Sequence, residues 1–160
     1  MTIPYEDSYA GQLRSAVGNR RLILPSARAI IRDAEGRILF VRRRDNGHWV
    51  MPAGSLEIGE SILDCVKREV REESGLDVLA ATLIAIYSGP RFAFTNAYGG
   101  EQQMLALVFR IDDWAGELVT ATDETTDARF FASDGLPALP LLYEETLRDL
   151  GAFDGTVILK

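Results

Sequence analysis

Four glutamates in one short stretch of the chain have the types and spacing for metal chemistry. Glu60 precedes a predicted helix, and Glu69, Glu72 and Glu73 lie within it. The i, i+3 and i+4 spacing of the helical glutamates makes them neighbours on the helix surface, where like charges repel. A hard divalent cation would relieve this repulsion, because Mg²⁺ and Mn²⁺ favour carboxylate oxygens. The stretch is therefore a candidate metal site.

Helical geometry separates these acids from the other charges of the same helix. We predict a helix from Ser61 to Ser74, in which Ser61 and Asp64 form a capping box. At about 100° per residue, Glu69 and Glu73 fall inside an apolar stripe, and Glu72 lies at its edge. The stripe consists of Ile62, Leu63, Cys65, Val66 and Val70, and the opposite, solvated face carries Asp64, Lys67, Arg68 and Arg71.

A simple solvated helix end is the alternative interpretation of this charge run. Solvated acids should share a face with Lys67 and Arg71, which the three glutamates do not. Partly buried acids need protons or a cation, so the metal interpretation is favoured.

The loop before the helix suits the same site. Gly54 lets the backbone approach a metal closely, and Gly59 permits a sharp turn before Glu60. Arg68 is placed to hold Glu60 or nearby backbone. We therefore expect Arg68 to position the acids rather than to bind metal.

Length and charge limit the classes of function. The chain has 160 residues and a mass of 17.7 kDa, which favours one compact domain. Its net charge of −7 and pI near 4.8 argue against a general nucleic-acid binder or an anionic-membrane binder, since both need a positive field. An anionic substrate would need a cation to mediate its binding.

Cysteine content and hydropathy bear on the compartment. Cys65 is the one cysteine, so an intrachain disulfide and a cysteine zinc cluster are both excluded. The first residues lack an apolar signal region, and the sequence contains no apolar run long enough to span a bilayer. These features favour a cytoplasmic protein without a membrane partner.

The order of predicted elements indicates a mixed sheet with helices on its faces. Ser8 caps a first helix that ends near Gly18 and either packs on the domain or forms a homodimer contact. Further on we expect a hairpin, a strand pair or single bent strand, a buried strand, two short strands, a helix and a tail strand. Their ranges are 22–44 with a turn at 33–36, 78–89, 104–111, near Leu118 and at 128–132, 140–150 and 156–160.

Two groups outside the acidic stretch could contact a substrate. Arg42, Arg43 and Arg44 alternate faces of a strand, and either guard a solvated edge or contact phosphate. Aromatic residues in the segment 91–102 either stack on a nucleobase or form a small satellite core. These aromatic residues are Phe92, Phe94 and Tyr98.

The acidic stretch resembles the complete Nudix box. Nine positions over twenty-three residues match the pattern, and none deviates: Gly54, Glu60, Arg68, Glu69, Val70, Glu72, Glu73, Gly75 and Leu76. Segments before and after the box also resemble Nudix sequences. The resemblance covers the chain from about Leu22 to Leu150.

The Nudix resemblance implies an α/β/α sandwich around a mixed β-sheet, with residues 1–20 as a helical arm and residues 21–160 as the Nudix domain. It implies Mg²⁺- or Mn²⁺-dependent hydrolysis of a diphosphate linkage in a nucleoside diphosphate joined to another moiety, so the expected partner is a nucleotide-like small molecule. A catalytically idle Nudix-fold nucleotide sensor is the alternative, although such a protein normally has a broken box or a DNA-binding extension.

Residue roles follow from the same resemblance. The implied metal ligands are Glu69, Glu72 and Glu73, with the Gly54 carbonyl and Glu60. The implied catalytic residues are Glu72, Glu69 and Arg68; Glu72 or Glu69 leads as general base, and Glu101 and Glu124 are outside candidates. The expected substrate contacts are Arg42, Arg44, Arg91, Phe92, Phe94, Tyr98 and Gln103.

Overall fold

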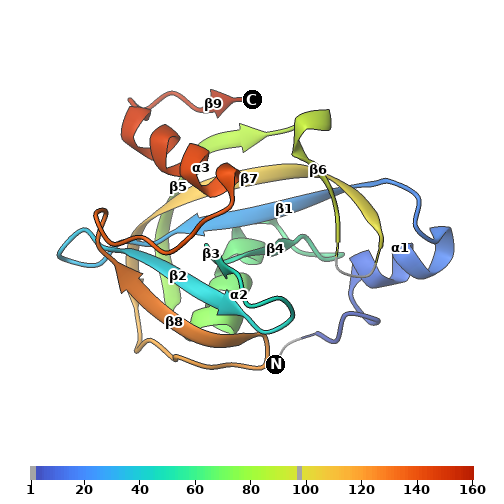
Figure 1. Cartoon of the computed structure of the whole chain (residues 1–160), viewed down its shortest axis with the longest axis horizontal. Helices are drawn as coiled ribbons and strands as arrows, with labels where there is room; N and C mark the ends of the chain where they lie inside the picture. The colour runs from blue at the N-terminus through green and yellow to red at the C-terminus, as the bar shows by residue number, and fades with distance from the viewer. Residues whose placement is uncertain (1–2, 97–98) are drawn as a thin grey trace.

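The computed structural model describes residues 3–96 and 99–160. Nine strands form two sheets within this part of the chain, and helices lie on both faces of the larger sheet (Figure 1). The elements in chain order are α1 Tyr9–Val17, β1 Leu22–Ile30, β2 Ile38–Arg43, β3 Trp49–Val50, β4 Ala53–Ser55, α2 Ile62–Ser74, β5 Asp77–Tyr87, η1 Pro90–Phe92, β6 Ala93–Thr95, β7 Glu101–Ala115, β8 Thr125–Phe131, α3 Leu141–Ala152 and β9 Ile158–Leu159.

The larger sheet is mixed, as predicted. Its strand order is β4-β1-β7-β5-β9, and β6 pairs with β7. Strand β1 pairs in parallel with β7 along its whole length and antiparallel with β4, which carries the start of the acidic stretch. The smaller sheet has the order β3-β2-β8.

Two hydrophobic clusters lie on opposite faces of the larger sheet. Alternate residues of β1 point to opposite faces, so Ala27 and Ala29 pack with Val66 and Val70 of α2. Ile30 faces the other way and packs in the cluster that α3 covers. This two-sided packing makes an α/β/α arrangement, with α2 held against β1, β4 and β5.

Three local predictions are wrong. The expected hairpin at 22–44 does not form: β1 and β2 join different sheets, linked near their turn by a bridge between Arg32 and Ile38. Residues near Leu118 form no strand. Leu63 is 41% exposed rather than part of the buried stripe, because the stripe packed against the sheet is narrower than a wheel projection suggests.

Other predictions are confirmed. Ser8 caps α1, which ends at Gly18, and Ser61 caps α2 with the predicted capping box to Asp64. Residues 77–87 form one long strand with bulges rather than a strand pair. The last helix runs on to Ala152, one residue beyond the expected stop at Gly151. None of the helices in residues 3–96 and 99–160 is long and apolar enough to cross a membrane.

The C-terminal end of α2 is sharply defined by Gly75. Gly75 ends the helix in the left-handed conformation, with φ of 76°, and its N–H donates to the Arg71 carbonyl. A Cβ added at Gly75 would lie 2.6 Å from Val119 Cγ2. Both the backbone and the packing therefore require glycine there.

We predict that Gly75→Ala lowers the free energy of unfolding by about 1–2 kcal/mol, because alanine is strained in this conformation and contacts Val119. Urea unfolding would measure the change. The control is Gly151→Ala, since Gly151 lies in α3 with open space around its Cβ and should gain up to about 1 kcal/mol. Equal effects of the two substitutions would contradict this account of the α2 terminus.

Candidate active site

Helix α2 presents its acids toward β4. Glu69 and Glu73 are 6% and 2% exposed, and Glu72 is half-buried. One Glu73 carboxylate oxygen accepts a hydrogen bond of 3.0 Å from the Ala53 amide. The predicted burial of Glu69 and Glu73 is therefore confirmed.

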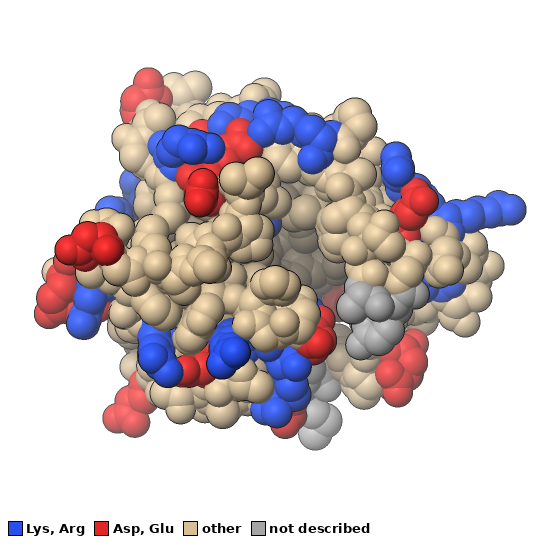
Figure 2. Space-filling model, in the orientation of Figure 1, with Lys and Arg blue, Asp and Glu red and all other residues tan. Residues whose placement is uncertain are grey.

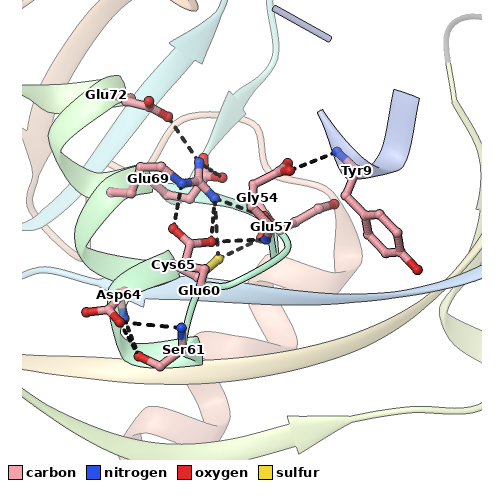
Figure 3. A network of polar contacts seen from close by, with 11 residues as sticks. Tyr9, Gly54, Glu57, Glu60, Ser61, Asp64, Cys65, Glu69 and Glu72 are labelled. Atoms are coloured by element: carbon pink, nitrogen blue, oxygen red, sulfur yellow. Dashed lines mark hydrogen bonds and ion pairs between the residues drawn. The ribbon is translucent and has the colours of Figure 1, made fainter. Parts of the chain in front are cut away.

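Arg68 forms ion pairs with three glutamates that Figure 3 labels, Glu60, Glu69 and Glu72. Its Nε and Nη2 lie 2.7 and 3.0 Å from the two carboxylate oxygens of Glu60. Nη1 donates to Glu69 at 2.7 Å and to Glu72 at 3.1 Å, and Nη2 also donates to the Ser55 carbonyl. The expected contacts of Arg68 with Glu60 and nearby backbone are present. Its placement on the solvated face was wrong, since its side chain is 22% exposed and points into the acid cluster.

Both oxygens of Glu60 are occupied within this network. Besides Arg68, the Glu57 amide donates to Glu60 at 3.1 Å. Burial alone would raise the pKa of Glu60, but the hydrogen bonds from Arg68 and Glu57 outweigh it and lower the pKa. The geometry thus places Glu60 as an anchor for Arg68.

A carboxylate from a distant loop completes the acid cluster. Within the described residues, carboxylate oxygens of Glu69, Glu73 and Glu124 all lie within 4.8 Å of one another. Glu124 directly precedes β8, and no regular spacing links it to the helical glutamates. Only the resemblance to Nudix proteins had made it an outside candidate for the base.

The position of Glu124 depends on hydrogen bonds around the loop before β8. The Thr125 hydroxyl donates to the Glu73 carbonyl at 3.2 Å, which ties the start of β8 to α2. Arg44 donates to the carbonyls of Thr122, Asp123 and Thr125. Arg44, an expected substrate contact, therefore also holds the loop that carries Glu124.

The clustered acids perturb one another. Burial raises the pKa of Glu69 to about 7, although Arg68 opposes the shift. Burial and the charge of Glu69 raise the pKa of Glu73 well above its ordinary value. Burial and the charge of Glu72 also raise the pKa of Glu124. Arg68 supplies one positive charge to this group of acids, which leaves negative charge on the carboxylates. The oxygens of three converging carboxylates are therefore suitable ligands for a divalent cation.

Gly54 lies directly against Glu69. A Cβ added at Gly54 would fall 1.9 Å from Glu69 Oε1, so no side chain fits there while Glu69 keeps its place. The Cys65 thiol lies 3.7 Å from the Gly54 carbonyl oxygen. The Gly54 carbonyl in β4 thus lies beside Cys65, and its role as a metal ligand stays a prediction.

The acids lie in a cleft of about 1180 Å³, seen as the hollow near the middle of the face in Figure 2. Arg44, Arg91, Phe92 and Phe94 line this cleft, among the expected substrate contacts. Arg42 and Gln103 do not line it, and Tyr98 lies outside the described residues. Their neighbours Arg43 and Gln102 line the cleft instead, because adjacent strand residues point to opposite faces.

The residues near the aromatic end of the cleft are already engaged with one another. Phe92 is 5% exposed and stacks on Tyr87, whereas Phe94 is 45% exposed. Arg91 forms an ion pair with Glu145 of α3. Phe92 is thus a core residue that reaches the cleft, and Phe94, like Tyr5, is an aromatic side chain exposed there.

The comparison with known families agrees with this geometry. A sequence model of the NUDIX domain matches residues 23–150. The chain belongs to the Nudix hydrolase family. The resemblance, the expected fold and the expected class of enzyme are therefore confirmed.

Individual Nudix relatives differ in how much of their length this chain covers. An ADP-ribose pyrophosphatase of Methanocaldococcus jannaschii is 33% identical over 134 residues, covering 81% of this chain and 75% of the relative. The NAD-capped RNA hydrolase NudC of Vibrio vulnificus is 36% identical over 95 residues, covering 59% of this chain and 33% of NudC. The chain thus spans only a third of that enzyme.

Solved Nudix structures share the fold. A MutT NUDIX hydrolase from Burkholderia pseudomallei superposes with a TM-score of 0.67 at 27% identity, covering 81% of this chain and 98% of that one. An ADP-ribose pyrophosphatase from Streptococcus suis has a TM-score of 0.60 at 27% identity, covering 85% and 96%.

The raised pKa values of Glu69 and Glu73 predict how the stability of the metal-free protein changes with pH. Folded Glu69 and Glu73 keep protons that the unfolded chain releases above an ordinary pKa of 4.5. Their contribution to stability is therefore full below pH 4.5 and is lost as the pH rises through about 7 and beyond. From Glu69, whose pKa rises from 4.5 to about 7, we expect a loss on the order of 3 kcal/mol in urea unfolding with EDTA, and the total loss should be smaller in Glu73→Gln.

Metal should reverse this loss. Adding Mn²⁺ should raise the midpoint of thermal unfolding more at pH 8 than at pH 5, because only the deprotonated acids bind the ion. A midpoint insensitive to Mn²⁺ at pH 8 would argue against a metal site at these acids.

We predict that Gly54→Ala lowers kcat/KM about a hundredfold, because the added methyl displaces the Glu69 carboxylate. Steady-state kinetics and Mn²⁺ titration would measure the loss. Gly135→Ala is the matched control, since the nearest atom to its added Cβ is 4.0 Å away. Unchanged kinetics in a folded Gly54→Ala protein would contradict the close packing of Gly54 and Glu69.

Proposed function

We propose that this Nudix hydrolase cleaves the diphosphate linkage of a nucleoside diphosphate derivative with Mg²⁺ or Mn²⁺. The observation that carries the proposal is the convergence of Glu69, Glu73 and Glu124 within 4.8 Å, two of them buried. Buried carboxylates with raised pKa values in a cleft are characteristic of functional sites. A diphosphate is the anionic group that a carboxylate-bound cation would attract.

Each acid of the cluster has its own role in this proposal. Glu69 and Glu73 from α2 would hold the divalent cation, and Glu124 from the loop before β8 would accept a proton beside it. When bound, the ion would neutralise the diphosphate and lower the pKa of a bound water. Arg68 keeps Glu69 and Glu72 in place, while Glu60 keeps Arg68 in place.

We assign the proton-accepting role to Glu124, where the sequence had favoured Glu72 or Glu69. Burial and the charge of Glu72 raise the pKa of Glu124, which suits a base near neutral pH. Glu69 and Glu72 are bonded to Arg68, and the Glu101 carboxylate pairs with Arg21 outside the cleft lining. Glu124 is thus a half-buried acid of the cluster that has no arginine ion pair within the described residues.

ADP-ribose is the first substrate to test. The relative from Methanocaldococcus jannaschii, of which this chain covers 75%, is an ADP-ribose pyrophosphatase. The solved structure from Streptococcus suis is also of an ADP-ribose pyrophosphatase. A cleft of about 1180 Å³ has room for a nucleotide joined to a sugar. Phe94 is an exposed aromatic side chain in the cleft lining that is available for stacking on a base.

We retain residues 1–20 as an arm on a Nudix domain at 21–160, because the family match begins at residue 23. The Tyr9 amide of α1 donates to Glu57 at 2.8 Å, and Arg14 donates to the Glu101 carbonyl at 2.9 Å. These contacts support packing of the arm on the domain. The homodimer and the cytoplasmic location stay predictions.

A substrate panel tests the proposal. It contains ADP-ribose, nucleotide sugars, NADH, dinucleoside polyphosphates and nucleoside triphosphates, each with Mg²⁺, Mn²⁺ or EDTA, and nucleotide products are followed by chromatography. We expect metal-dependent turnover that Glu124→Gln and Glu72→Gln each lower by about a hundredfold, as for a lost acid–base or ligand role.

Glu117→Gln, an exposed residue in the loop before β8, is the matched control and should keep wild-type rates. Tight nucleotide binding without metal-dependent turnover anywhere in the panel would instead support the idle sensor. A folded Glu124→Gln protein with wild-type kcat would remove Glu124 from the mechanism.

A further inference from the structure

Arg28 is a buried cation without an acidic partner. It lies in β1, is 2% exposed, and forms no ion pair within the described part of the chain. Buried charges in proteins are normally paired, because removal from water is costly. Arg68 shows the normal arrangement, with carboxylates of three glutamates around it.

Helix α3 holds the Arg28 guanidinium in a defined orientation. Its Nη1 donates to Thr146 Oγ1 at 3.1 Å, and the Thr146 hydroxyl donates in turn to the Leu142 carbonyl at 2.9 Å. The Tyr143 ring lies against the guanidinium, with its centroid 4.5 Å from Cζ. Two contacts of different kinds thus fix both the position and the plane of the group.

One buried donor of the guanidinium is left for a ligand. Arg28 Nε has no hydrogen-bond partner, whereas Nη1 donates to Thr146 and the guanidinium also hydrogen-bonds the Tyr143 side chain. Nε and Nη2 form the edge with which arginine binds carboxylates and phosphates through two parallel hydrogen bonds. An unsatisfied buried donor costs free energy unless a ligand completes it.

The position of Arg28 relates this edge to the acid cluster. Arg28 lines the cleft and stands opposite Ala53 in the pairing of β1 with β4. The Ala53 amide binds Glu73. Arg28 is therefore one strand away from Ala53, the backbone partner of Glu73, and lines the same cleft as the acid cluster.

The other arginines that line the cleft are already engaged. Arg43 pairs with Asp45, and Arg91 pairs with Glu145. Arg44 donates to three loop carbonyls, and Arg68 to the box glutamates. Of these cleft arginines, Arg28 is the one with a buried donor, Nε, that has no hydrogen-bond partner within the described residues.

We propose that the Nε edge of Arg28 binds a phosphate oxygen of the diphosphate directly, across the cleft from the acid cluster. This inference rests on the proposed function for its substrate class. The substrate is then held from two sides, by a cation on the carboxylates and by a protein cation on β1. Arg28 is thereby a substrate-binding residue that the Nudix box does not contain.

Binding of non-hydrolysable probes tests the assignment without turnover. Calorimetry with Mg²⁺ would compare α,β-methylene-ADP, methylenediphosphonate and adenosine on the wild type, Arg28→Met and Arg28→Lys. Arg37→Met is the matched control, because Arg37 is exposed in the turn before β2 and pairs with Asp33. We expect Arg28→Met to weaken both diphosphate probes roughly ten- to hundredfold and to leave adenosine binding unchanged.

Arg28→Lys should lose part of the affinity, since lysine keeps the charge but lacks the two-donor edge. The thermal midpoint of Arg28→Met should equal or exceed that of the wild type, because a buried, unpaired charge is removed. If Arg28→Met does not fold, Arg28→Lys carries the comparison.

Three results would overturn the assignment. The first is that Arg28→Met binds the diphosphate probes with affinities within twofold of wild type. The second is an equal loss of affinity for adenosine, which indicates a base contact. The third is a wild-type protein that binds neither diphosphate probe. The binding assay separates this inference from the proposed function. The wild type could bind the diphosphate probes, lose that binding on Arg28→Met, and still hydrolyse nothing in the panel. That result would support the Arg28 site and reject the hydrolase function.

Discussion

Repulsion among buried carboxylates is the constraint on which the rest of this structure depends. Glu69 and Glu73 lie inside the packing surface of α2, and Glu124 is brought against them from another element. One arginine cannot neutralise this set, so the acids retain protons or take up a cation. The same feature that makes the site unfavourable without metal makes it suitable for holding one.

The fold holds the acids together by hydrogen bonds at several levels. Arg68 bridges the glutamates of the loop and the helix, and Glu60 is committed to that arginine rather than to the cleft. The Ala53 amide and the absence of a side chain at Gly54 leave room for the acids beside β4. Rigid strands and a well-capped helix thus supply the support that a precise metal site requires.

Charge is distributed across the cleft in two parts. The acid cluster lies on the α2 side, and the buried Arg28 lies on β1 beneath α3. In the proposed function, Arg28 and a bound cation would neutralise the field of a chain with a net charge of −7 locally, where the anionic substrate binds. Helix α3, which carries no box residue, contributes by orienting Arg28 through Thr146 and Tyr143.

The sequence by itself determined the acidic helix, its capping box, the contact of Arg68 with Glu60 and the Nudix identity, because these depend on local spacing and helical period. Only the tertiary structure decided that β1 and β2 join different sheets and that Arg43 rather than Arg42 lines the cleft. It also brought Glu124 to the helical glutamates and left Arg28 unpaired. These last features arise from contacts between residues far apart in sequence, and no local periodicity encodes such contacts.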